Sequence, residues 1–498
     1  MSDPFAPLRA LPQQRLPDLF VGDSGRTDRL SLDVEGIRFD FAKTHLDAGA
    51  LDALTADAEA RDLPGQRAAL FAGARVNPTE NRAALHPAER GTGSIQAIAN
   101  AEALRARTRA LVDAVEAGAL GPIRHVLHVG IGGSALGPAL LLDALGRDSD
   151  RYDVRVVSNV DGAALAEATR DMDPQATLLC VASKTFTTAE TMLNARSALS
   201  WMEEGGVEDP YGQVVAMTAS PDAAVAWGVD ETRILPFSPE VGGRYSLWSS
   251  IGFPAALALG WDAWEALLAG AEAMDLHFGT APLGRNAPVL AAFADLLYAQ
   301  ARGAETRAVF AYDERLRLLP AYRQQLEMES NGKRVALDGA PLAYPSAPVT
   351  WGGVGTDAQH AVFQLLHQGT HLIPVEFVAV AEPGHNLDEE HHRQLLTNCF
   401  AQGAALMAGR DSADGHRAYS GDRPSMTFLL DRLAPRTLGA LLAFYEHRTF
   451  ANAVMLGINP FDQWGVELGK EIAKGLGQGG TRFDPSTEAL LDRAFEER

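Results

Sequence analysis

Short apolar runs that alternate with helical stretches constrain the fold of this chain more than any other feature. From about residue 120, the segments HVLHVGIGGSALGPALLLDAL, DVRVVSNVDGAALAEATRD, TLLCVASKTFTTAETMLNARSAL and VVAMTASPDAAVAWG each contain an apolar run, a turn and a helical pattern. Strands and helices that alternate at this spacing form βαβ units, whose parallel sheet is covered on both faces. The alternation resumes more loosely after a helical stretch near 262–305. We predict an α/β protein with two α/β/α sandwiches, parallel sheets, and helical additions at both termini.

The length of the chain favours more than one domain. A chain of 498 residues is too long for one ordinary core. We expect a helical N-terminal segment (1–115) that packs on the larger domain, a first sandwich (116–260), a second sandwich (261–475) and a C-terminal tail (476–498).

The net charge limits the kinds of partner that the protein can bind, and the cysteine content indicates its cellular compartment. The formal net charge is -21, which argues against a nucleic-acid or anionic-membrane partner. Two cysteines, Cys180 and Cys399, cannot form a disulfide framework, and we expect a reduced, cytoplasmic protein. No targeting segment or uninterrupted apolar span is evident.

One lysine lies among hydroxyl side chains at a junction between an expected strand and helix. Of the 43 basic residues only five are lysine, at 43, 184, 333, 470 and 474, which marks positions where a compact ammonium is wanted. Thr187 and Glu190 have the spacing of a capping box, so a helix would begin there. Amides, hydroxyls and the ammonium then form an anion site from Ser183, Lys184, Thr185 and Thr188. Alternatively, the hydroxyls only cap the helix and Lys184 is solvated.

The first glycine-rich turn, GIGGSALGP, lies where an open α/β sheet binds ligands. Its glycines allow close approach to the backbone, and Ser134 opens the next helix. The spacing matches neither the dinucleotide fingerprint nor a P-loop. A tight turn that binds nothing is the alternative.

Two charged residues stand in unusual surroundings. Arg244 follows two glycines in the apolar segment EVGGRYSLWSSIGFP, where it could stabilise negative charge or pair with a structural carboxylate. Glu329 precedes a turn-forming Ser-Asn-Gly at the end of a helix, so its carboxylate could project into a cleft. A solvated glutamate is the commoner outcome.

Histidines and the last lysines form a further group. His360 lies in the first turn of an expected helix, with His367 on the same face, and such residues are more often structural than catalytic. The segment EEHHR suggests a metal, but adjacent helical histidines point about 100° apart, so we expect no metal site. Lys470 is nearer the apolar face of its helix than Lys474, which is typical of the surface.

Six motifs together resemble the glucose-6-phosphate isomerase family, in its metal-independent form with two sugar-isomerase domains. In chain order they are GIGGSALGP, SKTFTTAET, VGGRYSLWSSIG, MESNGK, GTDAQHAVFQLLHQGT and PFDQWGVELGK, and they span about 130–475. The resemblance implies two sugar-isomerase domains with helical additions, the first with the phosphate site and the second with the catalytic Glu and His. It also implies interconversion of D-glucose 6-phosphate and D-fructose 6-phosphate, in glycolysis and gluconeogenesis.

The resemblance further implies a role for each residue. Glu329 would move a proton between C2 and C1 through a cis-enediol, and Arg244 would stabilise the enediolate. His360 and Lys470 would open the sugar ring. Phosphate contacts would come from Ser183, Lys184, Thr185 and Thr188, and other substrate contacts from Gly133, Ser134, Gln325 and Gln463.

The resemblance also implies that no cofactor is needed and that the protein is a homodimer, with His360 reaching the neighbouring subunit's site. Ala135 departs from members that carry an acid there. One alternative is a non-catalytic phosphosugar-binding regulator, which would not need Glu329, His360, Lys470 and Arg244 together. Another is the isomerase half of an amidotransferase, which would carry an N-terminal nucleophilic cysteine, whereas the first cysteine here is Cys180.

Overall fold

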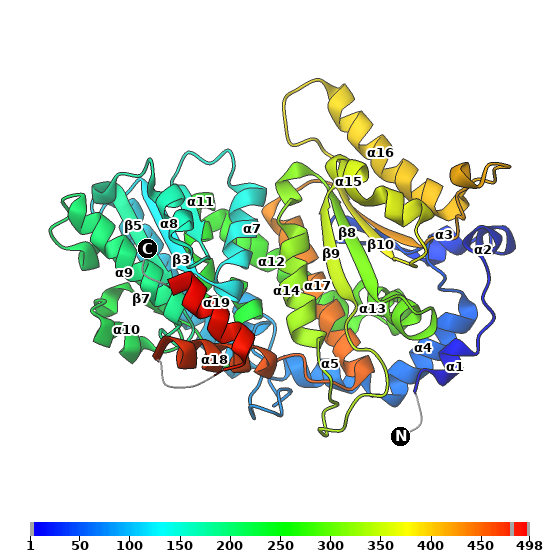
Figure 1. The fold of residues 1–498 in the computed structure, drawn as a ribbon, viewed down its shortest axis with the longest axis horizontal. Helices are drawn as coiled ribbons and strands as arrows, with labels where there is room; N and C mark the ends of the chain where they lie inside the picture. Colours follow the sequence, from blue (N-terminus) through cyan, green and yellow to red (C-terminus); the bar gives the residue numbers. More distant parts are fainter. Residues whose placement is uncertain (1–3, 479–482, 496–498) are drawn as a thin grey trace.

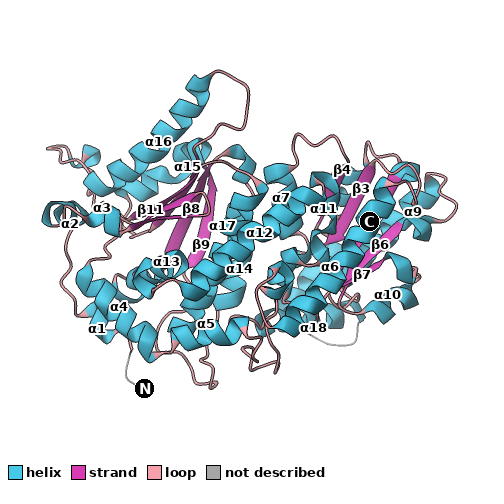
Figure 2. Ribbon diagram, turned by 180° about the vertical axis from the view of Figure 1, so that it is seen from behind, coloured by secondary structure: helices cyan, strands magenta, loops and turns pink. Residues whose placement is uncertain are grey.

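The computed structural model describes residues 4–478 and 483–495. Two α/β halves lie side by side along the longest axis, with long helices between them (Figure 1). Each half contains one sheet, and helices flank both sheets when the molecule is seen from behind (Figure 2). The predicted fold class is confirmed.

The first half is built on a five-stranded sheet of order β4-β3-β5-β6-β7, in which all neighbours are parallel. All six residues of β5 are buried, because helices cover both faces of the sheet. Its strands are β3 (His125–Gly130), β4 (Asp153–Val157), β5 (Thr177–Ala182), β6 (Val214–Thr218) and β7 (Ile234–Pro236). Its helices are α7 (Leu136–Leu145), α8 (Gly162–Thr169), α9 (Ala189–Glu204), α10 (Pro221–Trp227) and α11 (Phe253–Leu259).

The second half has a six-stranded sheet of order β1-β2-β11-β10-β8-β9. Four of its strands are mutually parallel, as predicted: β8 (Thr306–Tyr312), β9 (Val349–Val354), β10 (Val375–Val380) and β11 (Ser425–Leu430). Around them are α12 (Trp261–Thr280), α13 (Ala287–Leu296), α14 (Leu319–Asn331), α15 (Gly355–Gln368), α16 (Glu389–Ala408) and α17 (Pro435–Leu456).

The N-terminal segment differs from the mostly helical segment that we predicted. Strands β1 (Ser31–Val34) and β2 (Ile37–Asp40) form a hairpin that pairs with β11 in antiparallel fashion, so this sheet is mixed. Glu35 and Gly36 join the strands with φ of 51° and 72°, as a two-residue turn with left-handed residues requires. Each strand has four residues, too short to stand out among helical patterns.

The remaining N-terminal helices reach both halves. Helix α6 packs against α11 and β7 of the first half, while the hairpin joins the second half. The helices are α1 (Ala6–Arg9), α2 (Leu16–Gly22), α3 (Arg26–Arg29), α4 (Ala48–Ala60), α5 (Leu63–Phe71) and α6 (Ile95–Glu116). The domain boundaries proposed from sequence stay predictions.

The C-terminal region contains α18 (Glu467–Gln478) and α19 (Pro485–Phe495). Part of the predicted tail, 479–482 and 496–498, lies outside the described residues. Among the helices that the structure describes, none has the length and apolar character needed to cross a membrane.

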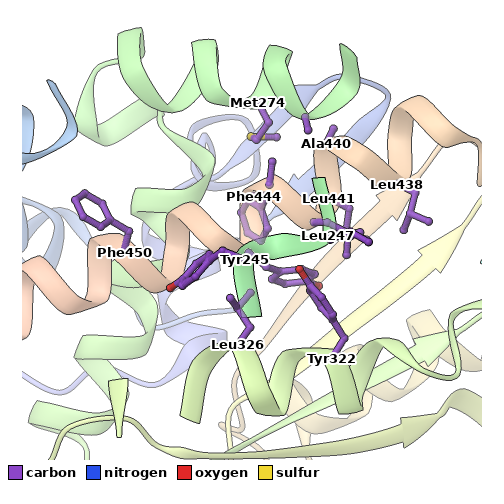
Figure 3. Packing of buried hydrophobic residues seen from close by; sticks show 14 of the residues in the cluster. Tyr245, Leu247, Met274, Tyr322, Leu326, Leu438, Ala440, Leu441, Phe444 and Phe450 are labelled. Carbon is purple, nitrogen blue, oxygen red and sulfur yellow. The ribbon is translucent and has the colours of Figure 1, made fainter. Parts of the chain in front are cut away.

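One central core joins the two halves. It includes Val126 and Leu178 from the first sheet and Val309 and Val378 from the second, together with nearly all of α17. Each sheet also has a smaller core on its outer face. Residues Tyr245 and Leu247 lie between α14 and α17 in this central core (Figure 3). The segment that carries Arg244 is therefore anchored where the halves meet.

Candidate active site

A cleft with a volume of about 390 Å³ lies at the carboxyl ends of β3 and β5, facing α14 and the loop before α18. Ligands bind at this position in open α/β sheets. Ten of the twelve predicted site residues line it: Gly133, Ser134, Ser183, Lys184, Thr188, Arg244, Gln325, Glu329, Gln463 and Lys470. Thr185 is exposed and does not line the cleft, although it follows Lys184 directly, and His360 lies elsewhere.

The glycine turn after β3 touches the segment that precedes Arg244. A Cβ at Gly133 would lie 2.2 Å from the backbone carbon and oxygen of Gly243, so only glycine fits. Gly132 has a φ of 56°, and a Cβ there would meet the side chain of Gln325 at 3.0 Å. The turn is therefore a packing surface for two other parts of the cleft as well as a possible ligand contact.

The loop from Ser183 to Thr188 is held by a contact between two of its own hydroxyls and by packing against neighbouring segments. Phe186 has a φ of 55°, an unfavourable conformation for a large side chain, and its buried ring packs edge-on against Trp227 at 5.7 Å. The hydroxyls of Ser183 and Thr188 are 3.1 Å apart. Burial of Phe186 thus holds a loop whose hydroxyls face the cleft.

The predicted capping box is wrong. Helix α9 begins at Ala189 with Thr188 at the N-cap, and no side chain caps it. The hydroxyl of Thr187 donates instead to that of Thr185, at 2.8 Å. The helix start is displaced because these hydroxyls bond to one another within the loop.

Lys184 is partly buried at the cleft wall, and its Nζ donates to the carbonyl oxygen of Val241 at 3.0 Å. Burial lowers the pKa of Lys184, and the positive charge of Arg82 lowers it further. The alternative of a fully solvated lysine is therefore excluded. Its ammonium retains donors for an anionic ligand.

Arg244 is fixed by hydrogen bonds from all three of its nitrogens. Its side chain is 1% exposed. Its Nε donates to Ser330 Oγ at 2.6 Å and its Nη1 to Gln463 Oε1 at 3.3 Å. Its Nη2 donates to the carbonyl oxygens of Pro460 and Asp462, at 2.5 and 3.0 Å. A guanidinium held in this way is a preorganised positive charge, which needs no reorganisation when negative charge develops nearby.

Glu329 is the carboxylate nearest to this guanidinium in the cleft. Its Oε1 is 3.5 Å from Arg244 Nη1, and its side chain is 19% exposed. One turn earlier on α14, the Nε2 of Gln325 donates to Glu329 Oε2 at 2.9 Å. Both side chains thus project from one face of the helix into the cleft.

Two predicted residues reach the cleft from the C-terminal part of the chain. Gln463 is the N-cap of a short turn, Trp464–Val466, that leads into α18. Lys470 lies on α18, where its Nζ is 2.9 Å from Glu467 Oε1 and its side chain is 59% exposed. Lys470 is therefore at the rim, not at the centre, of the cleft.

His360 does not line the cleft in this chain. It is exposed on α15 and borders a separate hollow of about 620 Å³ between α15 and α16, together with His367 and Gln402. His367 Nε2 is 2.8 Å from Gln402 Oε1, a structural contact. The structure thus separates one predicted site residue from the others.

Charged residues that sequence reasoning missed also line the cleft. Glu80 and Arg82 come from the N-terminal segment that we interpreted as packing, and Glu190 comes from the first turn of α9. The polar run NPTENR could have signalled the first two, because it interrupts an otherwise helical region. No sequence pattern near this run indicates that it lies beside Lys184.

Metal binding gains no support from the arrangement of possible ligands. In residues 4–478 and 483–495, no group of three or more His, Cys, Asp or Glu side chains is placed to hold a metal ion. The histidines near EEHHR contact one another with ring centroids about 6.3 and 6.4 Å apart.

Two joined α/β sandwiches hold a lysine and several hydroxyls in one cleft with a carboxylate and a fixed guanidinium. This arrangement suits an isomerase that acts on a sugar phosphate. The phosphoglucose isomerase family model matches residues 40–491. The chain belongs to this family.

Related proteins cover nearly the whole chain. It is 69% identical over 489 residues to glucose-6-phosphate isomerase of Rhizorhabdus wittichii, covering 98% of each protein. It is 59% identical to that of Zymomonas mobilis, covering 98% of this chain and 96% of the relative. A crystal structure of a glucose-6-phosphate isomerase from Chlamydia trachomatis superposes with a TM-score of 0.90 at 32% identity, covering 99% of this chain and 98% of the other.

Proposed function

We propose that this protein reversibly interconverts D-glucose 6-phosphate and D-fructose 6-phosphate, as an aldose–ketose isomerase of glycolysis and gluconeogenesis. Support comes from its family and from the names of relatives that match almost its full length. The single observation that carries the chemistry is the Glu329 carboxylate 3.5 Å from the Arg244 guanidinium, in the cleft that also contains Lys184.

Glu329 acts as the base in this proposal. Its carboxylate takes the proton from C2 of the open-chain aldose, and the electron pair of that bond forms the C1–C2 double bond while the carbonyl oxygen gains negative charge. This step gives the cis-enediolate, and transfer of the hydroxyl proton from O2 to O1 moves its negative charge to O2. Glu329 then returns its proton to C1, the carbonyl forms at C2, and the ketose results. A proton beside a carbonyl is weakly acidic, so the charge of Arg244 must be present where the oxyanion forms.

The phosphate end of the substrate binds at the loop after β5. The partly buried ammonium of Lys184, the hydroxyls of Ser183, Thr185 and Thr188, and the N-terminus of α9 together suit a phosphate dianion. Gly133, Ser134, Gln325 and Gln463 also line the cleft, and we assign the remaining substrate contacts to them. The bound phosphate thereby sets which carbon lies beside Glu329.

Ring opening requires proton transfer at the ring oxygen, and we assign it to Lys470 and His360. Since His360 borders a hollow apart from the cleft, it would act in the site of a second copy of the chain. We therefore propose a homodimer with shared active sites.

The proposed reaction moves protons only, so it needs no redox cofactor. We propose that it also needs no metal ion, because the fixed guanidinium of Arg244 supplies the positive charge that would stabilise the oxyanion. We propose a cytoplasmic location, because the two cysteines are unpaired and buried.

The central test is a coupled assay of glucose 6-phosphate formation from fructose 6-phosphate, on wild type and Glu329→Gln, with a metal chelator present. We expect full wild-type activity in chelator and a loss of about 10³-fold or more in the variant. An active Glu329→Gln protein would contradict the mechanism, and inhibition by the chelator would contradict the absence of a metal.

Subunit mixing tests the shared site. Glu329→Gln and His360→Ala homodimers are each expected to be nearly inactive. After subunit exchange, half of the dimers pair the two variants, and each of those has one intact site, so a quarter of wild-type activity should return. No recovery, despite exchange shown by native mass spectrometry, would mean that His360 acts within its own chain.

A further inference from the structure

Lys333 has no role in the proposed reaction, although it is one of only five lysines and belongs to the motif MESNGK. It follows the C-terminus of α14, and its side chain is 14% exposed. It does not line the cleft; it lines a neighbouring apolar hollow on the other side of Glu329. A buried lysine is costly unless it is paired, so its contacts should explain its presence.

All three donors of the Lys333 ammonium have oxygen partners. Its Nζ donates to the carbonyl oxygen of Glu329 at 3.2 Å, to the carbonyl oxygen of Asp462 at 2.6 Å and to Asp462 Oδ1 at 2.8 Å. Three oxygens therefore converge on one nitrogen. A compact ammonium suits this arrangement, whereas the planar fork of arginine spreads its donors over several ångströms.

The carbonyl of Asp462 links the base to the guanidinium. This oxygen accepts from Lys333 Nζ and also from Arg244 Nη2, the latter at 3.0 Å. Lys333 thus bonds to the backbone of Glu329 and shares an acceptor with Arg244. These hydrogen bonds form a junction that connects the backbone of Glu329 with the guanidinium of Arg244.

The Asp462 carboxylate extends the junction to a third segment. Its Oδ2 accepts from the hydroxyl of Thr79 at 2.6 Å and from Asn459 Nδ2 at 2.9 Å. The side chain of Asp462 is 8% exposed, so these bonds are shielded from water. Asp462 also immediately precedes Gln463, another predicted substrate contact.

We propose that Lys333 and Asp462 are positioning residues for the isomerisation, and that they fix Glu329 relative to Arg244 without touching the substrate. This inference rests on the proposed roles of Glu329 and Arg244. A displacement of about 1 Å between reacting groups can cost on the order of 10²-fold in rate, so loss of the junction should slow the chemical step more than it weakens binding.

The test compares Lys333→Met, Lys333→Arg and Asp462→Asn with the control Lys474→Met, which changes an exposed lysine of α18. We expect kcat to fall by about 10²-fold in the first three variants with little change in KM, and no change in the control. Rates are measured below the melting temperature of every variant. A lower melting temperature with an unchanged kcat would show a merely structural role and overturn the proposal.

Lys333→Arg keeps the positive charge, so it is the variant expected to fold if Lys333→Met does not. Recovery of full kcat in Lys333→Arg would overturn the claim that a single converging nitrogen is needed. The Lys333→Met/Asp462→Asn double variant should be no slower than the slower single variant, because both changes break one junction. If the falls in kcat of the two single variants multiply in the double variant, Lys333 and Asp462 act independently, and their proposed joint role is overturned.

The same substitution made in the Glu329→Gln variant distinguishes this inference from the proposed function. In Glu329→Gln, adding Lys333→Met should leave the residual rate unchanged, because there is no base left to position. A further fall by the same factor as in wild type would overturn the inference. A wild type without isomerase activity would refute the proposed function, and a fully active Glu329→Gln would refute the proposed base. If only Lys333→Met is fully active, the positioning role alone fails.

Discussion

The two ends of the cleft are built differently. The phosphate end is one short stretch, Ser183 to Thr188, that follows β5 and is held by the burial of Phe186 and a hydroxyl contact within the loop. The reaction end joins Arg244 to Ser330 and Gln463, which are 86 and 219 residues away in sequence. The proposed phosphate ligands therefore come from one continuous stretch, whereas the groups at the reaction end are brought together from distant segments by tertiary packing.

This difference predicts different kinetic consequences. Phosphate contacts are made equally in the ground state and the transition state, so losing one should raise KM. The Glu329–Arg244 geometry matters most when charge develops, so disturbing it should lower kcat. Each of the following substitutions tests whether the two ends of the cleft differ in this way.

Arg244→Lys should have the largest effect. A lysine keeps the positive charge but cannot reproduce the fork of donors that bonds to Ser330, Gln463 and two carbonyls. We expect kcat to fall by about 10²- to 10³-fold, measured at saturating fructose 6-phosphate. If only KM rises, Arg244 contributes to substrate binding alone, and the two ends of the cleft do not differ in their kinetic roles.

Gly133→Ala should disturb both ends, because the glycine turn packs on the segment of Arg244. The new Cβ would lie 2.2 Å from backbone atoms of Gly243, which must move. We expect kcat to fall by up to about 10²-fold, with KM also raised. The control Gly284→Ala places its Cβ in open space and should behave as wild type. Normal kinetics for Gly133→Ala would mean that the turn shifts without moving Arg244.

Lys184→Ala should act mainly on binding. Removing a charge-assisted hydrogen bond to phosphate costs about 1.5–3 kcal/mol, which is roughly 10- to 100-fold in KM. Full kcat should return at saturating substrate. An equal fall in kcat and kcat/KM would show that the phosphate end takes part in the chemical step.

The pH dependence of KM should give the smallest and most specific effect. Burial and Arg82 lower the pKa of Lys184 below its usual 10.5, and only the protonated form binds phosphate well. KM should therefore rise with increasing pH below that value. Removing a like charge raises the lysine pKa, so Arg82→Ala should move this rise to higher pH.

The control for this experiment is Arg124→Ala. Arg124 is exposed and precedes β3, at the end of the sheet opposite the cleft. Its pH profile should match that of wild type. A shift of the same size in both variants would mean that net charge, and not the proximity of Arg82 to Lys184, controls the profile.

Much of the first half was predictable because its signals are local. Apolar strands buried on both faces alternate with helices, so β3, β5 and β6 and the loops after β3 and β5 follow from neighbouring residues. The β1–β2 hairpin was missed because its strands gain stability only by pairing with β11, almost 400 residues later. The start of α9 was misplaced because Thr187 bonds to Thr185 instead of capping the helix.

The fold class, the family motifs and ten of the residues that line the cleft could be predicted from the sequence, because apolar periodicity and contiguous motifs express short-range physics. Tertiary packing brings Glu80 and Arg82 to the cleft, places His360 at a separate hollow, and connects Glu329 to Arg244 through Lys333 and Asp462. Those relations depend on how the two halves pack around one shared core, and no local pattern specifies that packing.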